Sequence, residues 1–247
     1  MRFIGIIPAR YASVRFPGKP LVMVHGKTMI RRVYEQACKC LLLNDVVVAT
    51  DDQRIFDHVS EFGKVVMTGE HASGTDRCLE AFEIINDNDA YNDSDGIINI
   101  QGDEPFIHPD QISLLIGKLQ QTGKNIVTLA KRITLAHEIH DPNVVKVVFS
   151  RSGKALYFSR LPIPYRRDNM QIHDEPPRSL HFKHLGLYGY KAATLKRIAK
   201  MPPDSLEIAE KLEQLRWMQQ DIDIFVEVTE KESIAIDTPE DLKRLDG

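Results

Sequence analysis

The sequence predicts an α/β fold, a mostly parallel sheet flanked by helices, with a small antiparallel insertion. Up to about residue 121, short continuous apolar runs alternate with amphipathic segments of helical period. Such runs are typical of strands buried on both faces, and strand–helix alternation implies parallel strands joined by right-handed crossovers. After Asn125, apolar runs follow one another without helices between them, which indicates antiparallel strands. We expect one domain, residues 1–247, with an inserted strand and loop subdomain at about 143–190.

The expected elements of the first half come in a regular order. Apolar residues three or four positions apart predict each helix, and the first helix should turn Val33, Ala37 and Leu41 to one side. Pro109 stands where a helix begins, because the first helical turn needs no proline N–H. The expected strands cover 3–7, 46–50, 64–68 and 96–100, and the expected helices cover 28–43, 53–62, 75–85 and 109–121.

The second half should begin with antiparallel strands, an element that often mediates dimerisation. "TPED" predicts the start of the last helix, because Thr238 and Asp241 can cap each other. In a helix at 206–218 we expect five inward residues, Leu206, Ala209, Leu212, Leu215 and Trp217. The expected strands cover 126–133, 144–150, 155–160, 182–190, 223–228 and 233–236, the helices cover 192–200, 206–218 and a segment from 239, and a loop rich in proline and arginine covers 161–178.

Composition and charge exclude several classes of function. The net charge of −3, the prolines that frame the cations of the N-terminal segment and the absence of an evident aromatic stacking platform argue against nucleic-acid binding. No apolar run reaches the roughly 18 residues of a membrane span. Three cysteines without framework spacing, Cys38, Cys40 and Cys78, indicate a reducing compartment. We therefore expect a soluble, cytoplasmic protein without nucleic-acid or membrane partners. The glycine motifs of standard phosphate loops and dinucleotide-binding loops do not occur in the sequence.

Charged residues follow several of the expected strands. Arg10, Arg15 and Lys19 lie in the proline-rich segment after the first strand. Asp103 follows the "GIINI" strand, and Asp237 follows "SIAI". Because ligands bind at the carboxyl ends of parallel strands, these groups should share one rim, where cations and carboxylates suit a nucleoside triphosphate with Mg²⁺. Two simpler interpretations stay open: Asp237 as a turn residue before the last helix, and Asp103 as part of a plain turn.

The segment "SGTDR" carries a cation at an unusual place. Arg77 falls in the first turn of an expected helix, where a positive charge opposes the helix dipole. A bound anion would relieve this, and so would a salt bridge to Asp76 or Glu80. Ser73 and Gly74 could present hydroxyl and N–H groups to a ligand.

Two later segments carry further polar candidates. His184 and Tyr188 lie four positions apart in an expected strand and therefore should share a face. His181 and His184 do not share a face, which argues against a metal pair. On the 206–218 helix, polar residues including Glu213 and Gln214 can lie along one side, for which a solvated face is the simpler interpretation.

Eight motifs occur in order over essentially the whole chain: "IPARYASVRFPGKPL", "ATDD", "SGTDR", "IQGDEP", "ALYFSR", "HLGLYGY", "LEQLRW" and "DTPEDL". Together they closely resemble the 3-deoxy-manno-octulosonate cytidylyltransferases, also called CMP-Kdo synthetases, which are related to the CMP-sialic acid synthetases. The departures are mild: Val14 and Phe16 where Thr and Leu are common, and a longer acidic loop at 86–95. The resemblance implies the Rossmann-like nucleotide-diphospho-sugar transferase fold and a homodimer.

The resemblance also implies a reaction and a set of site residues. CTP and 3-deoxy-D-manno-octulosonate (Kdo) would give CMP-Kdo and pyrophosphate for lipopolysaccharide synthesis, with Mg²⁺ as cofactor. The implied catalytic residues are Arg10, Lys19, Asp103 and Asp237, of which Asp103 and Asp237 hold the metal. The implied nucleotide-binding residues are Pro8, Ala9, Arg10, Arg15, Lys19, Ser73 and Gly74. The implied sugar-binding residues are Arg77, Gln101, Arg160, His184, Tyr188, Glu213 and Gln214.

Two alternatives stay open beside this function. The first is the same chemistry on an 8-amino analogue of Kdo or on a sialic acid. The second is a non-catalytic, nucleotide-binding regulatory protein on the same fold, which predicts loss of Lys19 or of a metal carboxylate; the sequence retains all of them.

Overall fold

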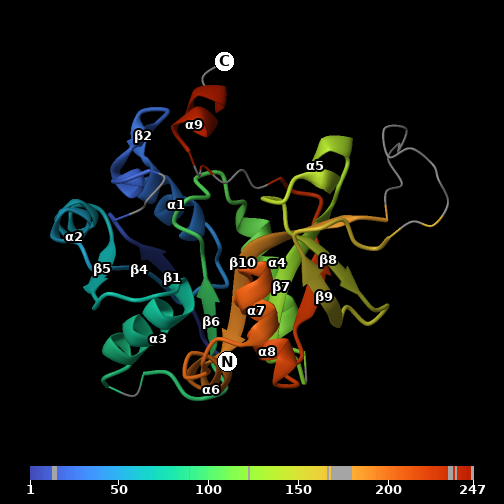
Figure 1. The fold of residues 1–247 in the computed structure, drawn as a ribbon. Coiled ribbons are helices and arrows are strands. Elements are labelled where there is room, and N and C mark those ends of the chain that lie inside the picture. Colours follow the sequence, from blue (N-terminus) through green and yellow to red (C-terminus); the bar gives the residue numbers. More distant parts are fainter. Residues whose placement is uncertain are drawn as a thin grey trace.

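The structure is a computed structural model of the 247-residue chain. It describes residues 1–12, 16–88, 90–121, 123–165, 167, 180–232, 236 and 238–245. Helices cover both faces of a central sheet (Figure 1), as the strand–helix alternation predicts. Within the described residues, no helix combines the length and the apolar character that a membrane crossing requires.

The centre of the sheet is β1 (Phe3–Ala9), a strand with an almost wholly buried sequence. It runs parallel to β4 (Asp45–Thr50) on one side and to β6 (Gly96–Asn99) on the other, and β5 (Lys64–Met67) extends the sheet parallel to β4. The carboxyl ends of β1 and β4 therefore lie side by side, with Ala9 opposite Thr50.

The other half of the sheet is attached through β10 (Phe182–Lys191). This strand is antiparallel both to β6 and to β7 (Ile126–Arg132), and β11 (Phe225–Val228) runs parallel to β7 at the edge. The resulting strand order is β11-β7-β10-β6-β1-β4-β5. β10 is the last strand of the segment predicted as an insertion, so that part of the expected insertion lies inside the main sheet.

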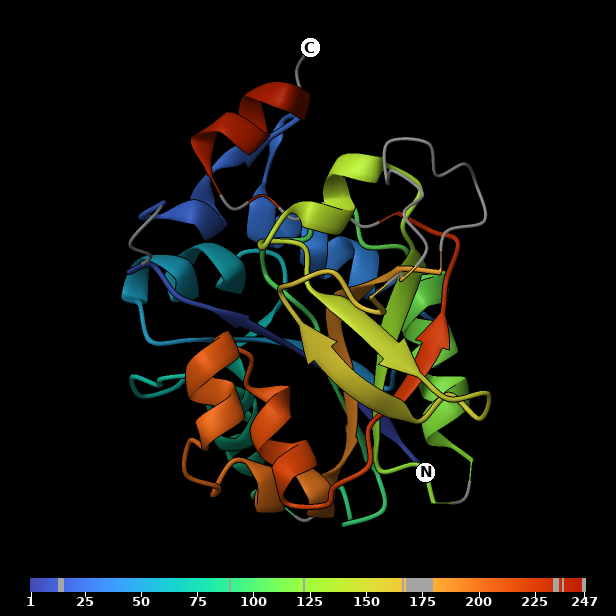
Figure 2. The ribbon, with the colours of Figure 1, turned by 45° about the vertical axis from the view of Figure 1, so that its right-hand side comes forward.

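The remaining strands of the expected insertion form an antiparallel pair. β8 (Lys146–Phe149) pairs with β9 (Ala155–Ser159) and, at one position, with β10. Figure 2 shows this pair in front of the main sheet. A short helix, α5 (Ala136–His140), precedes it and is one of the elements that the sequence pattern did not predict.

Two hydrophobic clusters, one on each face of the sheet, hold the helices. Because strand side chains alternate, Ile4 and Ile6 belong to one cluster while Phe3 and Ile7 belong to the other. The first cluster packs α3 (Gly74–Ile85), α6 (Ala192–Ile198) and α8 (Gln214–Gln219), with α7 (Ser205–Glu210) packed against α8. The second packs α1 (Met29–Ala37), α2 (Gln53–Ser60) and α4 (Pro109–Leu119).

A segment that follows the first strand packs against the C-terminal helix above the sheet. A one-turn helix η1 (Lys19–Leu21) leads into a small hairpin of β2 (Met23–Val24) and β3 (Lys27–Thr28), three elements too short for the sequence pattern to show. The C-terminal helix α9 (Pro239–Leu245) lies beside this hairpin (Figure 1). A third cluster joins them, with Val24, Met29 and Ile236 at its centre and Phe16, Phe106 and Leu242 around it.

Two predicted helices are shorter than expected. The helix expected at 28–43 ends at Ala37, and Leu41, predicted to face inward, is 95% exposed in the turns that follow. The helix expected at 206–218 is interrupted at Lys211, whose backbone is left-handed with φ 55°. This break turns Leu206 and Ala209 to the surface, so their predicted inward orientation is wrong, whereas Leu212, Leu215 and Trp217 are buried as predicted.

The last predicted strand, 233–236, lies largely outside the described residues. The predicted cap of the final helix is confirmed. The Thr238 hydroxyl accepts a hydrogen bond from the N–H of Asp241, and the Asp241 carboxylate accepts one from the N–H of Thr238, at 3.2 and 2.9 Å.

Candidate active site

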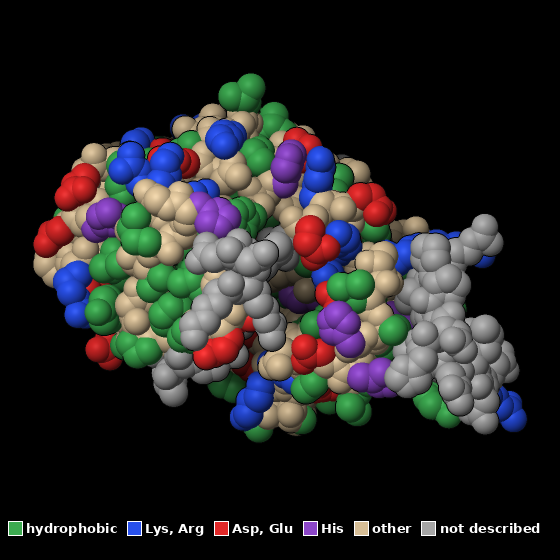
Figure 3. All heavy atoms as spheres, turned by 90° about the horizontal axis from the view of Figure 1, so that it is seen from above, with side chains coloured by type: hydrophobic (Ala, Val, Ile, Leu, Met, Phe, Trp, Pro, Cys, Tyr) green, Lys and Arg blue, Asp and Glu red, His purple; other side chains and the backbone are tan. Residues whose placement is uncertain are grey.

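A cavity of about 350 Å³ opens at the carboxyl ends of the central parallel strands. Figure 3 looks down on this side of the molecule and shows charged and histidine side chains around a hollow. The cavity is lined by Pro8, Ala9, Arg10, Lys19, Pro20, His71, Ala72, Ser73, Gly74, Arg77, Gln101, Gly102 and Asp103. The expectation that segments after β1 and β6 share one rim is therefore confirmed. The nucleotide-site residues predicted among the described ones all line this cavity.

The wall of the cavity depends on a close approach of two backbone segments. Gly102 follows β6, and a Cβ at this position would lie 2.8 Å from the carbonyl oxygen of Pro8. Only glycine lets the chain after β6 pass the end of β1 at this distance. The next residue, Asp103, is thereby brought to the cavity.

Lys19 and Asp103 form an ion pair across the mouth of the site. The ammonium Nζ of Lys19 lies 2.7 Å from Oδ2 of Asp103, and the Asp103 side chain is 27% exposed. Lys19 stands on η1, directly after Gly18, whose left-handed φ of 73° turns the chain back toward the sheet. The cation of the N-terminal segment and the carboxylate after β6 are thus neighbours, as the sequence predicts.

A stacked pair at the start of the same segment was not predicted. The guanidinium carbon of Arg54 lies 3.3 Å from the centre of the Tyr11 ring, and two hydrogen bonds of 2.9 and 2.6 Å tie that guanidinium to the Asp52 carboxylate. Gly18 donates its N–H to the carbonyl oxygen of Tyr11 at 2.9 Å. Tyr11 thus fastens both ends of the segment that carries the predicted phosphate-binding cations. The "ATDD" motif contains Asp52, but no spacing in the sequence links it to Tyr11.

The N-terminus of α3 forms another part of the wall. The Ser73 hydroxyl caps this helix by accepting the N–H of Asp76 at 3.1 Å. Gly74 packs against Pro8 at the end of β1, with 3.5 Å between an ideal Cβ and the proline ring. Helix N-termini favour negatively charged ligands, because their N–H groups and the helix dipole face outward.

His71 is a cavity residue that sequence reasoning missed. Its Nε2 is hydrogen-bonded to Glu80, whose carboxylate also accepts the N–H of Gly69 at 2.9 Å. The hydrogen bond from His71 is the main reason why the pKa of Glu80 lies below its usual value. A histidine two positions before "SGTDR" was the available signal, but a single histidine in a loop does not predict a site.

Arg77 lines the cavity, but its guanidinium is bound to the protein. The residue is 3% exposed, and its nitrogen atoms donate to Asp51 at 2.6 Å and to Thr68 at 2.7 Å. A salt bridge was one of the two explanations expected for this cation. The guanidinium pairs with Asp51 after β4 rather than with Asp76 or Glu80 on the same helix.

The predicted sugar-binding residues of β10 lie together on one face, as expected. The rings of His184 and Tyr188 are 5.3 Å apart, and Nε2 of His184 is hydrogen-bonded to the Thr128 hydroxyl at 2.9 Å. A bulge in β10 between Leu185 and Tyr188 accommodates that hydroxyl. Burial lowers the pKa of His184 to about 3 and raises that of Tyr188 well above its usual value. His184 is therefore a neutral hydrogen-bonding group at ordinary pH.

Gln101 connects the two groups of residues. It lines the cavity, and its side-chain Nε2 donates to the carbonyl oxygen of Gly186 in the β10 bulge at 2.8 Å. The end of β6, which carries the cavity wall, is in this way joined to the strand that carries His184 and Tyr188.

Gln214 begins α8 and is buried, and Glu213, the residue before it, has a side chain that is 25% exposed. Glu213 accepts a hydrogen bond of 2.8 Å from the Thr75 hydroxyl of α3. Burial raises the pKa of Glu213, an effect that the Thr75 hydrogen bond partly offsets. Because the helix breaks at Lys211, these two residues do not belong to the solvated helix face that was the simpler interpretation.

Arg160 lies apart from the cavity wall. Its guanidinium donates to three carbonyl oxygens, those of Glu210, Pro142 and Lys211, at 2.7, 2.9 and 3.3 Å. Its backbone N–H donates to the Glu210 carboxylate at 2.9 Å. These contacts give Arg160 a structural role at the junction of β9 and α7.

Two predicted residues, Arg15 and Asp237, lie outside the described residues. The chain neighbour of Asp237 does reach the site: the N–H of Ile236 donates to the carbonyl oxygen of Asp103 at 3.0 Å. Among the described residues, no group of three or more His, Cys, Asp or Glu side chains could hold a metal ion.

The fold and the cavity agree with the comparison to known families. A family model described as cytidylyltransferase matches residues 4–226. The chain belongs to the cytidylyltransferase family. The closer resemblance noted from the motifs is confirmed by curated relatives named 3-deoxy-manno-octulosonate cytidylyltransferase. One from Parabacteroides distasonis is 48% identical, covering 99% of this chain and 96% of the relative. One from Cytophaga hutchinsonii is 48% identical, with 98% and 95% covered.

Solved structures give the same result. A CMP:2-keto-3-deoxy-manno-octonic acid synthetase in complex with CTP is similar with a TM-score of 0.87 and 38% identity, covering 99% of this chain and 97% of that one. A 4-diphosphocytidyl-2C-methyl-D-erythritol synthase is similar with a TM-score of 0.66 at 12% identity, which shows a shared fold alone.

Proposed function

We propose that the protein transfers CMP from CTP to the anomeric hydroxyl of Kdo, giving CMP-Kdo and pyrophosphate for lipopolysaccharide synthesis. The observation that carries this proposal is the nearly full-length identity of 48% to relatives named for this reaction. The solved relative that binds CTP supports the nucleotide. The cavity, with cations, a carboxylate and a helix N-terminus at one rim, is chemically suited to a triphosphate.

In this proposal, CTP occupies the cavity. Backbone groups of Pro8 and Ala9, together with Ser73, would recognise the cytosine. Arg10, Lys19 and Arg15 would neutralise the triphosphate, and Gly74 would present its backbone at the N-terminus of α3. A cation beside a phosphate stabilises the charge that develops on the leaving pyrophosphate. The hydrogen bond from Gly18 to Tyr11 fixes Gly18, the residue before Lys19, ahead of binding, which lowers the entropic cost of placing that cation.

Asp103 and Asp237 would hold Mg²⁺. Asp103 fits this role, because its carboxylate is partly exposed at the cavity and only its Oδ2 atom is engaged by Lys19 in the ion pair. Mg²⁺ characteristically takes one or two carboxylates, with phosphate oxygens and water completing its shell. Bound there, the ion would polarise the α-phosphate and lower the pKa of the attacking hydroxyl. Lys19 would hold the Asp103 carboxylate in place through their ion pair.

The sugar acid would lie beside Gln101, between the cavity and the group formed by His184, Tyr188, Glu213 and Gln214. Neutral His184 and the Glu213 carboxylate offer hydrogen bonds to sugar hydroxyls. Catalysis would come mainly from holding the anomeric hydroxyl in line with the α-phosphate. Arg77 and Arg160, predicted to face the sugar carboxylate, would have to add that contact to the hydrogen bonds they already make.

Pyrophosphate release tests the proposal directly. Purified protein with Mg²⁺ is given CTP, UTP, ATP or GTP, each with Kdo, its 8-amino analogue or a sialic acid. Release with CTP and Kdo alone is the expected result. Release with CTP and a different acid would overturn the sugar assignment. Folded protein that binds CTP but releases no pyrophosphate with any pair would favour the regulatory alternative.

The proposed setting of the enzyme is the cytoplasm, as a homodimer formed through the strands β8 and β9. Exposed apolar side chains on and after β9, Leu156 and Leu161, are 58% and 70% exposed and support that surface. Sedimentation at assay concentration tests the dimer, and a monomer would contradict it.

A further inference from the structure

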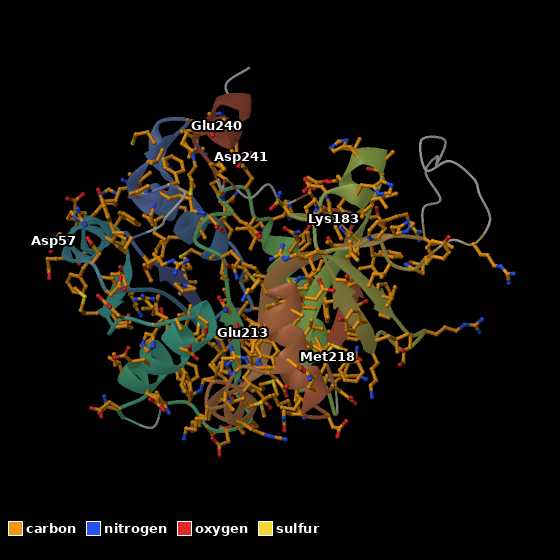
Figure 4. The ribbon with its side chains drawn as sticks, viewed as in Figure 1. Asp57, Lys183, Glu213, Met218, Glu240 and Asp241 are labelled. Atoms are coloured by element: carbon orange, nitrogen blue, oxygen red, sulfur yellow. The ribbon has the colours of Figure 1, made fainter. Side chains whose placement is uncertain are left out.

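A buried hydrogen bond joins the first turn of α3 to α8. Thr75 is 2% exposed, and its hydroxyl donates to Oε2 of Glu213 at 2.8 Å. Figure 4 shows Glu213 between α3 and the helix pair α7 and α8. Thr75 directly follows Ser73 and Gly74, which line the cavity. The Glu213 carboxylate is therefore fixed from behind the wall of the proposed nucleotide site.

The other oxygen of Glu213 is fixed from its own helix. Oε1 accepts from the guanidinium of Arg216 at 3.1 Å. Arg216 is itself 7% exposed and is held by the Glu207 carboxylate at 2.8 Å and the Met201 carbonyl oxygen at 2.7 Å. Arg216 thus holds Glu213 from its own helix, whereas the hydrogen bond from Thr75 ties Glu213 to the turn of α3 that borders the cavity.

A cluster of buried aromatic rings lies close enough to Glu213 for its tyrosines to feel the carboxylate charge. Tyr188, Tyr190 and Trp217 pack with ring centres 5.6 to 5.9 Å apart, and the hydroxyls of both tyrosines are buried without a hydrogen-bond partner. A hydrogen bond to a carboxylate is stronger in such a low-dielectric site than in water. Losing the donor would leave an oxygen of this partly buried carboxylate without its protein partner, which is costly.

Several neighbouring groups shift the pKa of Glu213 in opposite directions. Burial raises its pKa, and the Thr75 hydroxyl, the Arg216 charge and the Ser73 hydroxyl lower it in that order, while Asp76 raises it. The neighbouring groups of β10 and α3, Tyr188, Tyr190 and Cys78, stay neutral near pH 7 because burial raises the pKa of each. Thr75 is thus the strongest of the groups that favour the ionised carboxylate.

We propose that Thr75 is a positioning residue for the acceptor: its hydroxyl fixes the Glu213 carboxylate where it binds a hydroxyl of the sugar acid. This role rests on the proposed function, in which Glu213 belongs to the sugar site. Because the same turn of α3 borders the cavity, a nucleotide that contacts Ser73 and Gly74 also steadies Glu213. Binding of the nucleotide is thereby coupled to binding of the sugar acid.

The test compares Thr75→Val, which keeps the shape but loses the hydroxyl, with Thr75→Ser, which keeps the hydroxyl. Steady-state kinetics are measured for Kdo and for CTP between pH 5.5 and pH 9. Thr75→Val should lower kcat/KM for Kdo about tenfold or more, the size expected for a hydrogen bond to a charged group. Its KM for CTP should change less than about twofold, and Thr75→Ser should retain most of the wild-type value.

The pH profile separates positioning from packing. Without the Thr75 hydroxyl the pKa of Glu213 rises further, so the acid limb of kcat/KM for Kdo should move to higher pH in Thr75→Val and stay in place in Thr75→Ser. A Thr75→Val enzyme with wild-type kinetics would refute the role, and so would equal losses in the Val and Ser variants.

Two further measurements complete the test. In the double variant Thr75→Val with Glu213→Gln, the losses in kcat/KM for Kdo should not add, because Thr75 acts through Glu213. Additive losses in kcat/KM would show that Thr75 does not act through Glu213. If Thr75→Val does not fold, Thr75→Ala against Thr75→Ser makes the same comparison. Wild-type protein that forms no CMP-Kdo would refute the proposed function instead, a result distinct from any difference between variants.

Discussion

Gly18→Ala should weaken CTP binding, because the added methyl group would press against the Tyr11 ring and displace the neighbouring Lys19. Gly26→Ala provides a matched control. Both glycines have left-handed backbones, with φ of 73° and 81°. A Cβ at Gly18 would lie 3.1 Å from the Tyr11 ring, whereas a Cβ at Gly26 would have no neighbour within 4 Å. The two substitutions share the backbone cost of the left-handed region and differ in the contact with Tyr11.

The shared cost is about 1–2 kcal/mol for a non-glycine residue in that region. For a chain of this size, each 1 kcal/mol lowers the melting temperature by about 2–4 °C. Gly18→Ala adds overpacking, which typically costs about 1–3 kcal/mol. The Tyr11 ring cannot yield freely, because the Arg54 guanidinium lies 3.3 Å from its centre. We therefore expect a total loss of about 2–5 kcal/mol for Gly18→Ala.

The effect on CTP follows from the position of Lys19, the residue after Gly18. A displacement of some tenths of an ångström in its backbone would misplace the ammonium that contacts Asp103. We expect the KM for CTP to rise about tenfold in Gly18→Ala, since errors of about 1 Å can cost a hundredfold in rate. Gly26→Ala should leave this KM within about twofold. Thermal melts and pyrophosphate-release kinetics measure both effects, and equal KM values for CTP in the two variants would refute the reasoning.

Two other substitutions test the site from different sides. Asp103→Asn should lower kcat about a hundredfold or more at fixed Mg²⁺ with little change in melting temperature, because it removes a charge from the proposed metal site; near-normal turnover at that Mg²⁺ concentration would exclude a metal role. His184 has a pKa near 3 in the folded protein and about 6.5 in the unfolded chain. Between these two pH values the unfolded state binds more protons, so the free energy of unfolding falls as the pH drops. His184→Gln should flatten this dependence in urea unfolding at pH 7, 5.5 and 4.5, and an unchanged slope would show that other groups cause it.

Local pattern was sufficient for most of the fold and for the rim of the cavity. Continuous apolar runs identify β1, β4 and β6, because strands covered on both faces must be apolar on both faces. Once these strands are parallel neighbours, the residues after them must meet. For this reason the proximity of Lys19 and Asp103 is predictable without any side-chain detail.

Features that depend on contacts between distant segments were not predictable in the same way. The Arg77 partner, Asp51, lies 26 positions away on a different element, whereas helix spacing suggested neighbours on its own helix. The break at Lys211 is set by a left-handed residue that is not a glycine, so no sequence signal marks it. Leu41 continues the apolar spacing of α1, which is why the sequence predicts a longer helix. The helix nevertheless ends at Ala37, and Leu41 is exposed.

The strand order has a consequence for how the chain folds during synthesis. β6 ends at Asn99, yet its second neighbour, β10, begins at Phe182. Until that strand leaves the ribosome, β6 is an open edge of the growing sheet. Its residues are all buried in the finished fold, and the unpaired edge could pair with another chain. β7 also requires β10 before it joins the sheet. Arrest of synthesis between residues 132 and 182 would therefore leave the half-sheet with an unpaired edge at β6 and would leave β7 without either of its partner strands, the stage at which this chain most needs a chaperone.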